Sequence, residues 1–444
     1  MHTIIHGDCL EELKKLDDNS VDAVVTDPPY GLSNTKPQQV ADVLKAWVTG
    51  DTVSVPAKRG GFMGKDWDSF VPPPAVWEEC MRVLKPGGHM AVFAGARTQD
   101  LMGLSIRLAG FEIRDTLGWV YGSGFPKSMD ISKAIDKAAG AEREVVGRTK
   151  TPFKVDAAAH RGTSLQGSVN GDFSKQVDEN GYRYTEHTAP ATSEAQRWDG
   201  WGTALKPAIE PIILARKPLD GTVASNVLAH GVGGLNIDAC RVSTDDDTSR
   251  PPGRDGGNAT WDLSSREKPS VSHSAGRFPA NVLLDEHAAK EMDEQSGNLS
   301  PGARPGNTAT RPKFNGATYN SGKVYDGKID EPRVAMDSGG GASRFFPVFK
   351  YQAKAPKRER PVIVREDGTK VQHPTVKPLK LMEWLVTLIT PEGGTVLDPF
   401  AGTGTTLQAA TNKGFHPIGI EADAAYIQLI HQRTEGGEQS TRNN

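Results

Sequence analysis

The chain has 444 residues and a formal net charge of −3; 36% of its residues are hydrophobic and 24% are charged. These values exclude a uniformly basic nucleic-acid coat and an acidic tail, and they suit a globular protein with room for a large core. No apolar run approaches the ~20 residues of a membrane-spanning helix, and the N-terminus lacks the order of a secretory signal. Three distant cysteines without a CxxC pair argue against disulfides and a metal site. We therefore expect no metal and a reducing, intracellular setting.

The first part of the chain alternates short β-branched runs with segments of helical spacing. The predicted strands lie over 3–6, 21–26, 89–94 and 111–121. The predicted helices lie over 9–16, 75–84 and 97–108. Strands that alternate with helices of this length indicate a parallel sheet with crossover connections.

The middle of the chain is polar and rich in glycine and proline. Two stretches, at about 150–201 and 241–343, carry few apolar residues, so we expect long loops or insertions there.

The alternating pattern returns near the C-terminus. Helices are predicted over 378–389, 405–412 and 423–433, and strands over 395–397 and 417–420. Neither end of the chain has enough predicted strands to form a stable sheet by itself. We therefore predict an α/β fold with one doubly wound, mostly parallel sheet, assembled from both chain ends with the middle inserted.

A glycine-containing turn, DPFAGTGT, follows the strand at 395–397. Such strand-to-helix turns let a ligand approach the backbone and aim helix N–H groups at it. Glu421 ends the next strand, where an acid can accept from both hydroxyls of a ribose. Leu407 replaces the third glycine of a dinucleotide site, and Asp398 would repel phosphate. The turn therefore favours a nucleoside cofactor with a cationic end; the alternative is a tight turn with a surface glutamate.

The sequence Asp27-Pro28-Pro29-Tyr30 follows the strand at 21–26. Two prolines cannot continue a central strand, and they stiffen the backbone where it leaves the sheet. An acid, a carbonyl and an aromatic ring are thus presented together at the carboxyl end of a strand, where ligands bind in such sheets. The alternative is a strand-ending turn with an incidental tyrosine.

These two motifs together resemble the amino-group DNA methyltransferases that use S-adenosylmethionine. The order, DPPY first and the glycine turn last, is similar to their β group, in which the target-recognition region lies between the two halves. The segments at 6–10, 85–88, 210–214 and 373–378 fit the same family. The resemblance implies a Rossmann-like methyltransferase sheet in circularly permuted order, with an irregular inserted recognition region. Its implied parts are a catalytic half (1–149), a polar insertion (150–200), the end of the catalytic half (201–220), the target-recognition region (221–360) and a cofactor-binding half (361–444).

The resemblance also implies roles for individual residues. Asp27 and the Pro28 carbonyl would accept the hydrogens of an exocyclic amine, Pro29 would stiffen the turn, and Tyr30 would stack on a flipped base. The implied cofactor-binding residues are Asp8, Cys9, Thr375, Lys377, Asp398, Phe400, Ala401, Gly402, Thr403, Gly404, Thr405 and Glu421. The implied contacts to DNA or the target pocket are Trp119, Arg344, Lys350 and Lys354.

Two of these roles have plain alternatives. Asp8 would accept from the cofactor's adenine amine, but it can equally cap the helix at 9–16. Lys377 would approach the methionine carboxylate, but a solvated lysine near a helix start is the alternative.

The implied reaction is methyl transfer from S-adenosylmethionine to the N6 amine of adenine in duplex DNA, by base flipping and direct in-line transfer. Aspartate at the first DPPY position favours adenine, whereas cytosine-N4 enzymes of this family more often carry serine; cytosine-N4 methylation stays the alternative. A nicotinamide oxidoreductase is disfavoured by the missing glycine, and a catalytically silent DNA-binding protein by the intact motifs.

The implied partner is double-stranded DNA in the cytoplasm of a bacterium or a phage-infected host cell. The target sequence, dimerisation and a cognate restriction endonuclease stay open.

Overall fold

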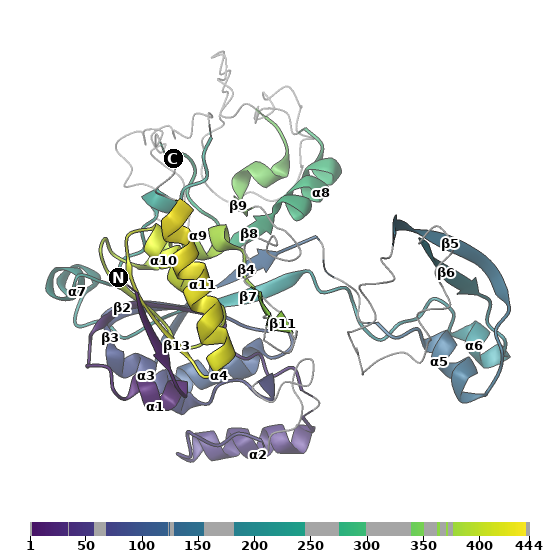
Figure 1. Cartoon of the computed structure of the whole chain (residues 1–444), viewed down its shortest axis with the longest axis horizontal. Coiled ribbons are helices and arrows are strands. Elements are labelled where there is room, and N and C mark those ends of the chain that lie inside the picture. The colour runs from purple at the N-terminus through teal and green to yellow at the C-terminus, as the bar shows by residue number, and fades with distance from the viewer. Residues whose placement is uncertain are drawn as a thin grey trace, which may run out of the picture. The chain divides into compact units, whose positions relative to one another are not determined.

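The computed structural model describes residues 2–33, 35–56, 68–122, 124, 128–154, 182–244, 275–298, 339–349, 362–364, 370–371 and 376–440. The chain divides into two compact units. Unit 1 comprises Met1–Ser123 and Ala208–Asn444, and unit 2 comprises Gly124–Pro207. Both chain ends therefore belong to one unit, as Figure 1 shows from the yellow C-terminal elements beside the purple N-terminal strands.

Unit 1 is built on one large mixed sheet. Within the described ranges nine strands take part, in the order β1-β13-β12-β2-β3-β7-β4-β8-β9. Their bounds, in that order, are Thr3–His6, His416–Glu421, Thr395–Asp398, Val21–Thr26, Leu84–Phe93, Ile209–Arg216, Glu112–Val120, Val282–Asp285 and Val348–Phe349.

Strands from the two chain ends are neighbours in this sheet. In β12, Leu397 lies opposite Ile418 of β13 on one side and Val24 of β2 on the other, and both pairings are parallel. The exception to the parallel arrangement is β7, which runs antiparallel to β3 and β4. The predicted sheet of mostly parallel strands assembled from both ends is confirmed.

Helices cover both faces of the sheet. Alternate residues of a strand point to opposite sides, so the apolar strands present side chains to both faces. Val24 packs in a cluster with Leu13 and Trp77, and Val25 packs in another with Leu385. The first face carries α1 (Cys9–Leu13), α2 (Pro37–Val48), α3 (Pro74–Val83) and α4 (Gln99–Leu108). The second carries α9 (Leu379–Ile389) and α10 (Thr405–Asn412), while α11 (Ala424–Ser440) lies beside α10, β1 and β13.

Part of the segment 221–360 belongs to the sheet itself. Leu283 and Leu284 of β8 are fully buried, and β8 pairs with β4 on one side and β9 on the other. The remaining described elements of this region are α7 (Val223–His230), η4 (Asp238–Cys240), α8 (Glu286–Ser296) and η5 (Ala342–Phe345). A short hairpin, β10 (Ile363–Val364) with β11 (Lys370–Val371), follows.

Unit 2 contains α5 (Ile131–Ala138), the hairpin β5 (Val145–Lys154) with β6 (Tyr182–Thr188), and α6 (Ser193–Arg197). The buried Asp136 carboxylate ties it together, because it pairs with Arg143 and accepts from the Thr192 hydroxyl at 2.8 Å. The compact insert therefore begins at 124, earlier than the polar stretch at 150 from which the sequence predicts an insertion.

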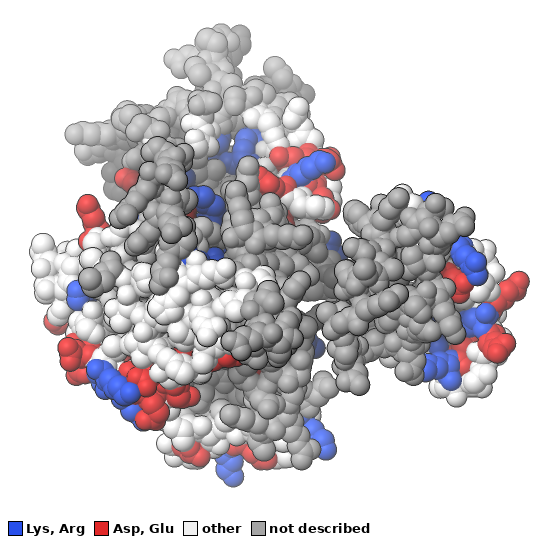
Figure 2. Space-filling model, viewed as in Figure 1, with Lys and Arg blue, Asp and Glu red and all other residues white. Residues whose placement is uncertain are grey.

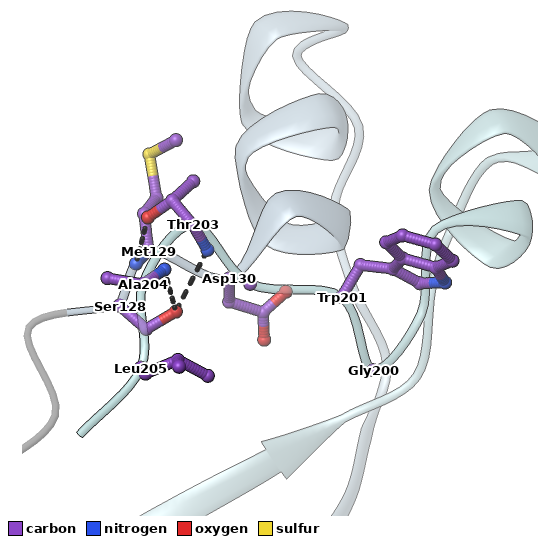
Figure 3. A pocket seen from close by; sticks show the side chains of 9 residues that line it. Ser128, Met129, Asp130, Gly200, Trp201, Thr203, Ala204 and Leu205 are labelled. Carbon is purple, nitrogen blue, oxygen red and sulfur yellow. Dashed lines mark hydrogen bonds between the residues drawn. The ribbon is translucent and has the colours of Figure 1, made fainter.

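Unit 2 also carries an open surface pocket (Figure 3). At one end the Ser128 hydroxyl accepts from the backbone N–H of Thr203 at 2.9 Å and Ala204 at 3.3 Å. The lining residues are Ser128, Met129, Asp130, Gly200, Trp201, Gly202, Thr203, Ala204 and Leu205. The sequence predicts a functional role for none of them.

Charges of both signs are intermingled over the described surface that faces the viewer in Figure 2. Among the described helices, none is long and apolar enough to cross a membrane.

Candidate active site

The two sequence motifs meet at the carboxyl ends of β2 and β12. The Thr26 hydroxyl, at the end of β2, donates to Asp398 Oδ1 at 2.6 Å, and both groups are buried. Because β2 and β12 are parallel neighbours, residues 27–30 and 398–405 leave the sheet at the same edge.

Four side chains at this edge form what we call the carboxylate–lysine cluster: Asp27, Tyr30, Glu210 and Lys377. The Lys377 ammonium lies 2.7 Å from Asp27 Oδ2, 3.2 Å from Glu210 Oε2 and 3.0 Å from the Tyr30 hydroxyl. The Tyr30 hydroxyl in turn donates to Asp27 Oδ1 at 2.8 Å. The cluster joins the DPPY turn, the start of β7 and the residue two before α9.

The charges of this cluster follow from its burial and its composition. Lys377 is only 9% exposed, which by itself lowers its pKa, but the carboxylates of Asp27 and Glu210 raise that pKa more, to well above the ordinary value. Burial and the same two carboxylates raise the pKa of Tyr30 well above its ordinary value. At neutral pH the cluster therefore holds an ammonium and a neutral phenol that donates hydrogen bonds.

The backbone of the DPPY turn is held by two side chains that the sequence did not single out. Asp68, 2% exposed, accepts from the backbone N–H of Tyr30 at 2.6 Å and of Gly31 at 3.0 Å. The Thr98 hydroxyl donates to the Tyr30 carbonyl at 2.6 Å. Gly31 has φ +67° beside the backbone of Phe70 and Val71, which favours glycine there.

The glycine turn is held by Glu421 and by two left-handed glycines. Gly402 and Gly404 have φ of 54° and 76°. The Gly402 N–H donates to Glu421 Oε2 at 2.8 Å, and the Asp423 N–H donates to Oε1 at 2.8 Å. These hydrogen bonds and backbone angles hold the shape of the turn.

Two carboxyl groups of this turn have raised pKa values. Burial raises the pKa of Glu421 to about 7 and that of Asp398 to about 6, against the hydrogen bonds that each accepts. A phosphate would be repelled here, whereas ribose hydroxyls and a cationic centre suit these acceptors. These two acceptor side chains therefore fit a nucleoside sulfonium such as S-adenosylmethionine.

Asp8 and Cys9 lie next to the same turn, because the Gly7 N–H donates to the Glu421 carbonyl at 3.0 Å. Asp8 caps α1 and accepts from Leu10 N–H at 3.0 Å, as its alternative role requires. Burial raises the pKa of Cys9 to about 12, so this residue is a neutral thiol at physiological pH.

The other predicted cofactor residues differ in accessibility. Phe400 is partly buried, with its ring 6.4 Å from that of Trp77. Ala401, Thr403 and Thr405 are buried, so they can support the turn or offer backbone, and Thr375 lies outside the described residues. Their roles toward a cofactor stay predictions.

Of the predicted DNA-contacting residues, the structure describes Trp119 and Arg344. Trp119 is 1% exposed, and its ring centroid lies 6.0 Å from that of Phe349. The Arg344 guanidinium donates to the carbonyls of Gly340 and Gly341, both at 2.8 Å. Lys350 and Lys354 lie outside the described residues, and contact of any of the four with DNA stays a prediction.

In the described part of the chain no group of three or more His, Cys, Asp or Glu side chains could hold a metal ion.

Comparison with known proteins gives a family match over most of the chain. Residues 21–161 and 205–432 match the N6_N4_Mtase family, described as DNA methylase. The chain is 22% identical to the type II methyltransferase M.HindIII of Haemophilus influenzae, over 97% of this chain and 94% of that protein. It is 34% identical to the DNA adenine methyltransferase YhdJ of Escherichia coli over a shorter region, 27% of this chain and 34% of YhdJ.

Among solved structures, the cytosine-N4-specific PvuII DNA methyltransferase is a remote neighbour. It is 13% identical to this chain and has a TM-score of 0.39, with 97% of this chain and 87% of the other covered.

Proposed function

Because the chain belongs to the N6/N4 DNA methylase family, we propose that it transfers a methyl group from S-adenosylmethionine to the N6 amine of adenine in double-stranded DNA. The observation that carries this proposal is the hydrogen bond between Thr26, the residue before Asp27, and Asp398, the first residue of the glycine-turn motif. A donor held by the turn and an acceptor base held by DPPY would then lie within reach of one another.

On the cofactor side, the chain supplies a hydrogen-bonded turn and two acids. A bound sulfonium supplies an activated methyl group. Glu421 would accept from the ribose hydroxyls with the lone pairs left by its two backbone donors, while the Asp398 carboxyl lies beneath the turn. A Cβ at Gly404 would meet Ile430 Cγ2 at 2.9 Å, so a glycine here lets the turn pack closely against α11.

On the DNA side, the chain supplies an acceptor and a carbonyl for a poor nucleophile. The lone pair of an exocyclic amine is delocalised into its base. Asp27 and the Pro28 carbonyl would accept its two hydrogens and favour a pyramidal nitrogen aimed at the methyl carbon. Alignment of this kind can supply several kcal/mol of rate enhancement. As the new N–C bond forms and the S–C bond breaks, Asp27 would take the proton that the nitrogen releases.

The target base must leave the duplex to reach Asp27. An enzyme that modifies a base cannot reach the reacting atom while the base is stacked in the helix. The ring of Tyr30 offers a stacking face beside Asp27, worth about 1–3 kcal/mol per stacked base in other proteins.

Adenine is favoured over cytosine by two observations. The first DPPY position is aspartate, and the relative YhdJ is named a DNA adenine methyltransferase. The test is to incubate the protein with S-adenosylmethionine and unmethylated bacterial DNA, digest the DNA and separate the nucleosides by mass spectrometry. We expect N6-methyladenine. N4-methylcytosine would contradict the adenine assignment alone, and 5-methylcytosine or unmodified DNA would contradict amino-group methylation.

A further inference from the structure

The two carboxylates of the carboxylate–lysine cluster share a single ammonium. Lys377 has three N–H donors, and the structure gives them three acceptors within 3.2 Å: Asp27 Oδ2, Glu210 Oε2 and the Tyr30 hydroxyl. The side chain also lies over two rings, with its nitrogen 4.9 Å from the centroid of Phe93 and 5.3 Å from that of Tyr30. The position of the ammonium is therefore determined by all of these contacts together.

We propose that Glu210 is a positioning residue for the methyl-transfer reaction: it holds Lys377 between itself and Asp27, so that Asp27 stays oriented yet free enough to accept a hydrogen bond from the target amine. This inference rests on the proposed function and adds a role for a carboxylate on a different strand, 183 residues from Asp27 in the sequence.

The first argument is geometric. Asp27 uses one oxygen toward Lys377 and the other toward Tyr30, at 2.7 and 2.8 Å. Each carboxylate oxygen can accept two hydrogen bonds, so an amine hydrogen can still bind while these contacts hold the carboxylate plane. Without Glu210, Lys377 loses one of its three acceptors, and the ammonium is free to shift toward Asp27 or away from it.

The second argument is electrostatic. One ammonium between two carboxylates leaves the cluster with a net negative charge, because the Tyr30 phenol is neutral. Both carboxylates attract the ammonium that lies between them, at 2.7 Å from Asp27 and 3.2 Å from Glu210. Glu210 therefore opposes a shift of Lys377 toward Asp27 alone.

Glu210 is also well placed to be changed without loss of the fold. Its side chain is 28% exposed, and its backbone lies in β7, where it is paired with Trp119 of β4. Glutamine has the same shape as glutamate and still fits this position, but it offers the ammonium no charge.

The first test compares Glu210→Gln with Glu210→Asp and with the control Glu112→Gln. Glu112 is a carboxylate at the other end of the same strand pair, bonded to Arg216 at 2.6 Å. For Glu210→Gln we expect kcat for DNA methylation to fall by about 10- to 100-fold, because the amide oxygen carries no charge and holds the ammonium less strongly than a carboxylate does. We expect KM for S-adenosylmethionine and the melting temperature to stay near those of the wild type, partial recovery of kcat in Glu210→Asp, and no change in kcat for Glu112→Gln.

The second test is a double-mutant cycle of Glu210→Gln and Lys377→Met. If Glu210 acts by holding the ammonium, its replacement should lower kcat in the wild type but not in Lys377→Met, where no ammonium is left to hold.

The outcomes separate this inference from the proposed function. A Glu210→Gln protein with wild-type kcat, or one whose melting temperature falls in step with its activity, would overturn the positioning role. A double variant whose kcat falls as far below that of Lys377→Met as the kcat of Glu210→Gln falls below that of the wild type would overturn it too. A wild-type protein that methylates no DNA would contradict the proposed function instead.

Discussion

The hydroxyl of Thr26 and the carboxylate of Asp398 are hydrogen-bonded at 2.6 Å, although 372 residues separate them in the chain. This buried contact links the ends of two parallel strands, and each strand is followed by one of the two motifs. The site can form only when both chain ends have joined the sheet. The link therefore couples the stability of the fold to the geometry of the site.

Replacement of Thr26 by valine removes this donor while it keeps the shape of the side chain. Asp398 would lose one of the hydrogen bonds that oppose the effect of burial on its pKa. We expect the free energy of unfolding to fall by about 1–3 kcal/mol and the affinity for S-adenosylmethionine to weaken. Urea unfolding and calorimetric titration measure the two effects. The control Thr116→Val, at an exposed position of β4, should change neither. Equal stabilities of the two variants would show that the link contributes nothing.

Gly404 and Gly414 form a matched pair for testing the cofactor turn. Their φ angles are +76° and +78°, so alanine is strained by about 1–2 kcal/mol at either position. Only at Gly404 would the new Cβ meet another side chain, at 2.9 Å from Ile430 Cγ2, whereas nothing lies within 4 Å at Gly414. We expect Gly404→Ala to lose cofactor affinity and to melt at a lower temperature than Gly414→Ala. Similar affinities in the two variants would rule out the close packing of this turn as a requirement for binding.

The raised pKa of Glu421 predicts a pH dependence of stability. Its pKa is about 7 in the folded chain and near 4.5 in the unfolded chain, so between these values the folded state binds a proton that the unfolded state has released. The contribution of Glu421 to the free energy of unfolding therefore falls as pH rises from about 5 to 7. Asp398, with a pKa of about 6, acts in the same direction.

Glu421→Gln should reduce this pH dependence. The free energy of unfolding in urea is measured for the cofactor-free variant and wild type at pH 5 and pH 7.5, and its change with pH is compared between the two proteins. The opposing contribution of His89, whose pKa burial lowers to about 4, is present in both proteins and cancels in the comparison. A variant that loses as much stability as the wild type over this interval would contradict the raised pKa.

The sheet was predictable where burial makes the sequence pattern strong. All six residues of VDAVVT in β2 are buried, and a short β-branched run of that kind indicates a buried parallel strand. Helix α2 and the elements of unit 2 were not predicted. Lys36 offers no side-chain cap to α2, and β6 reads YRYTEHT, which has no apolar face for a core. Such elements depend on contacts, such as those of Asp136, that no local pattern reveals.

The motifs of the site were predictable, but the contacts between them were not. The sequence predicts that Lys377 approaches a cofactor carboxylate; in the structure its ammonium bonds to Asp27, and a place beside the cofactor stays a prediction. Asp68 lies 38 residues from the backbone N–H of Tyr30 that it binds, in a segment without regular spacing. Contacts of this kind arise from the path of the chain through the sheet, and residue spacing does not encode them.

The central claim is that the Asp27 carboxylate acts on an amine methylated from a donor at the glycine turn. Transfer of labelled methyl groups from S-adenosylmethionine to DNA, with Asp27→Ala, Asp27→Asn and the exposed control Asp17→Ala beside the wild type, tests it most directly. We expect both Asp27 variants to lose about 100-fold or more in rate while they still bind S-adenosylmethionine, and we expect Asp17→Ala to match the wild type. A rate within tenfold of the wild type in Asp27→Ala would contradict the role of this carboxylate.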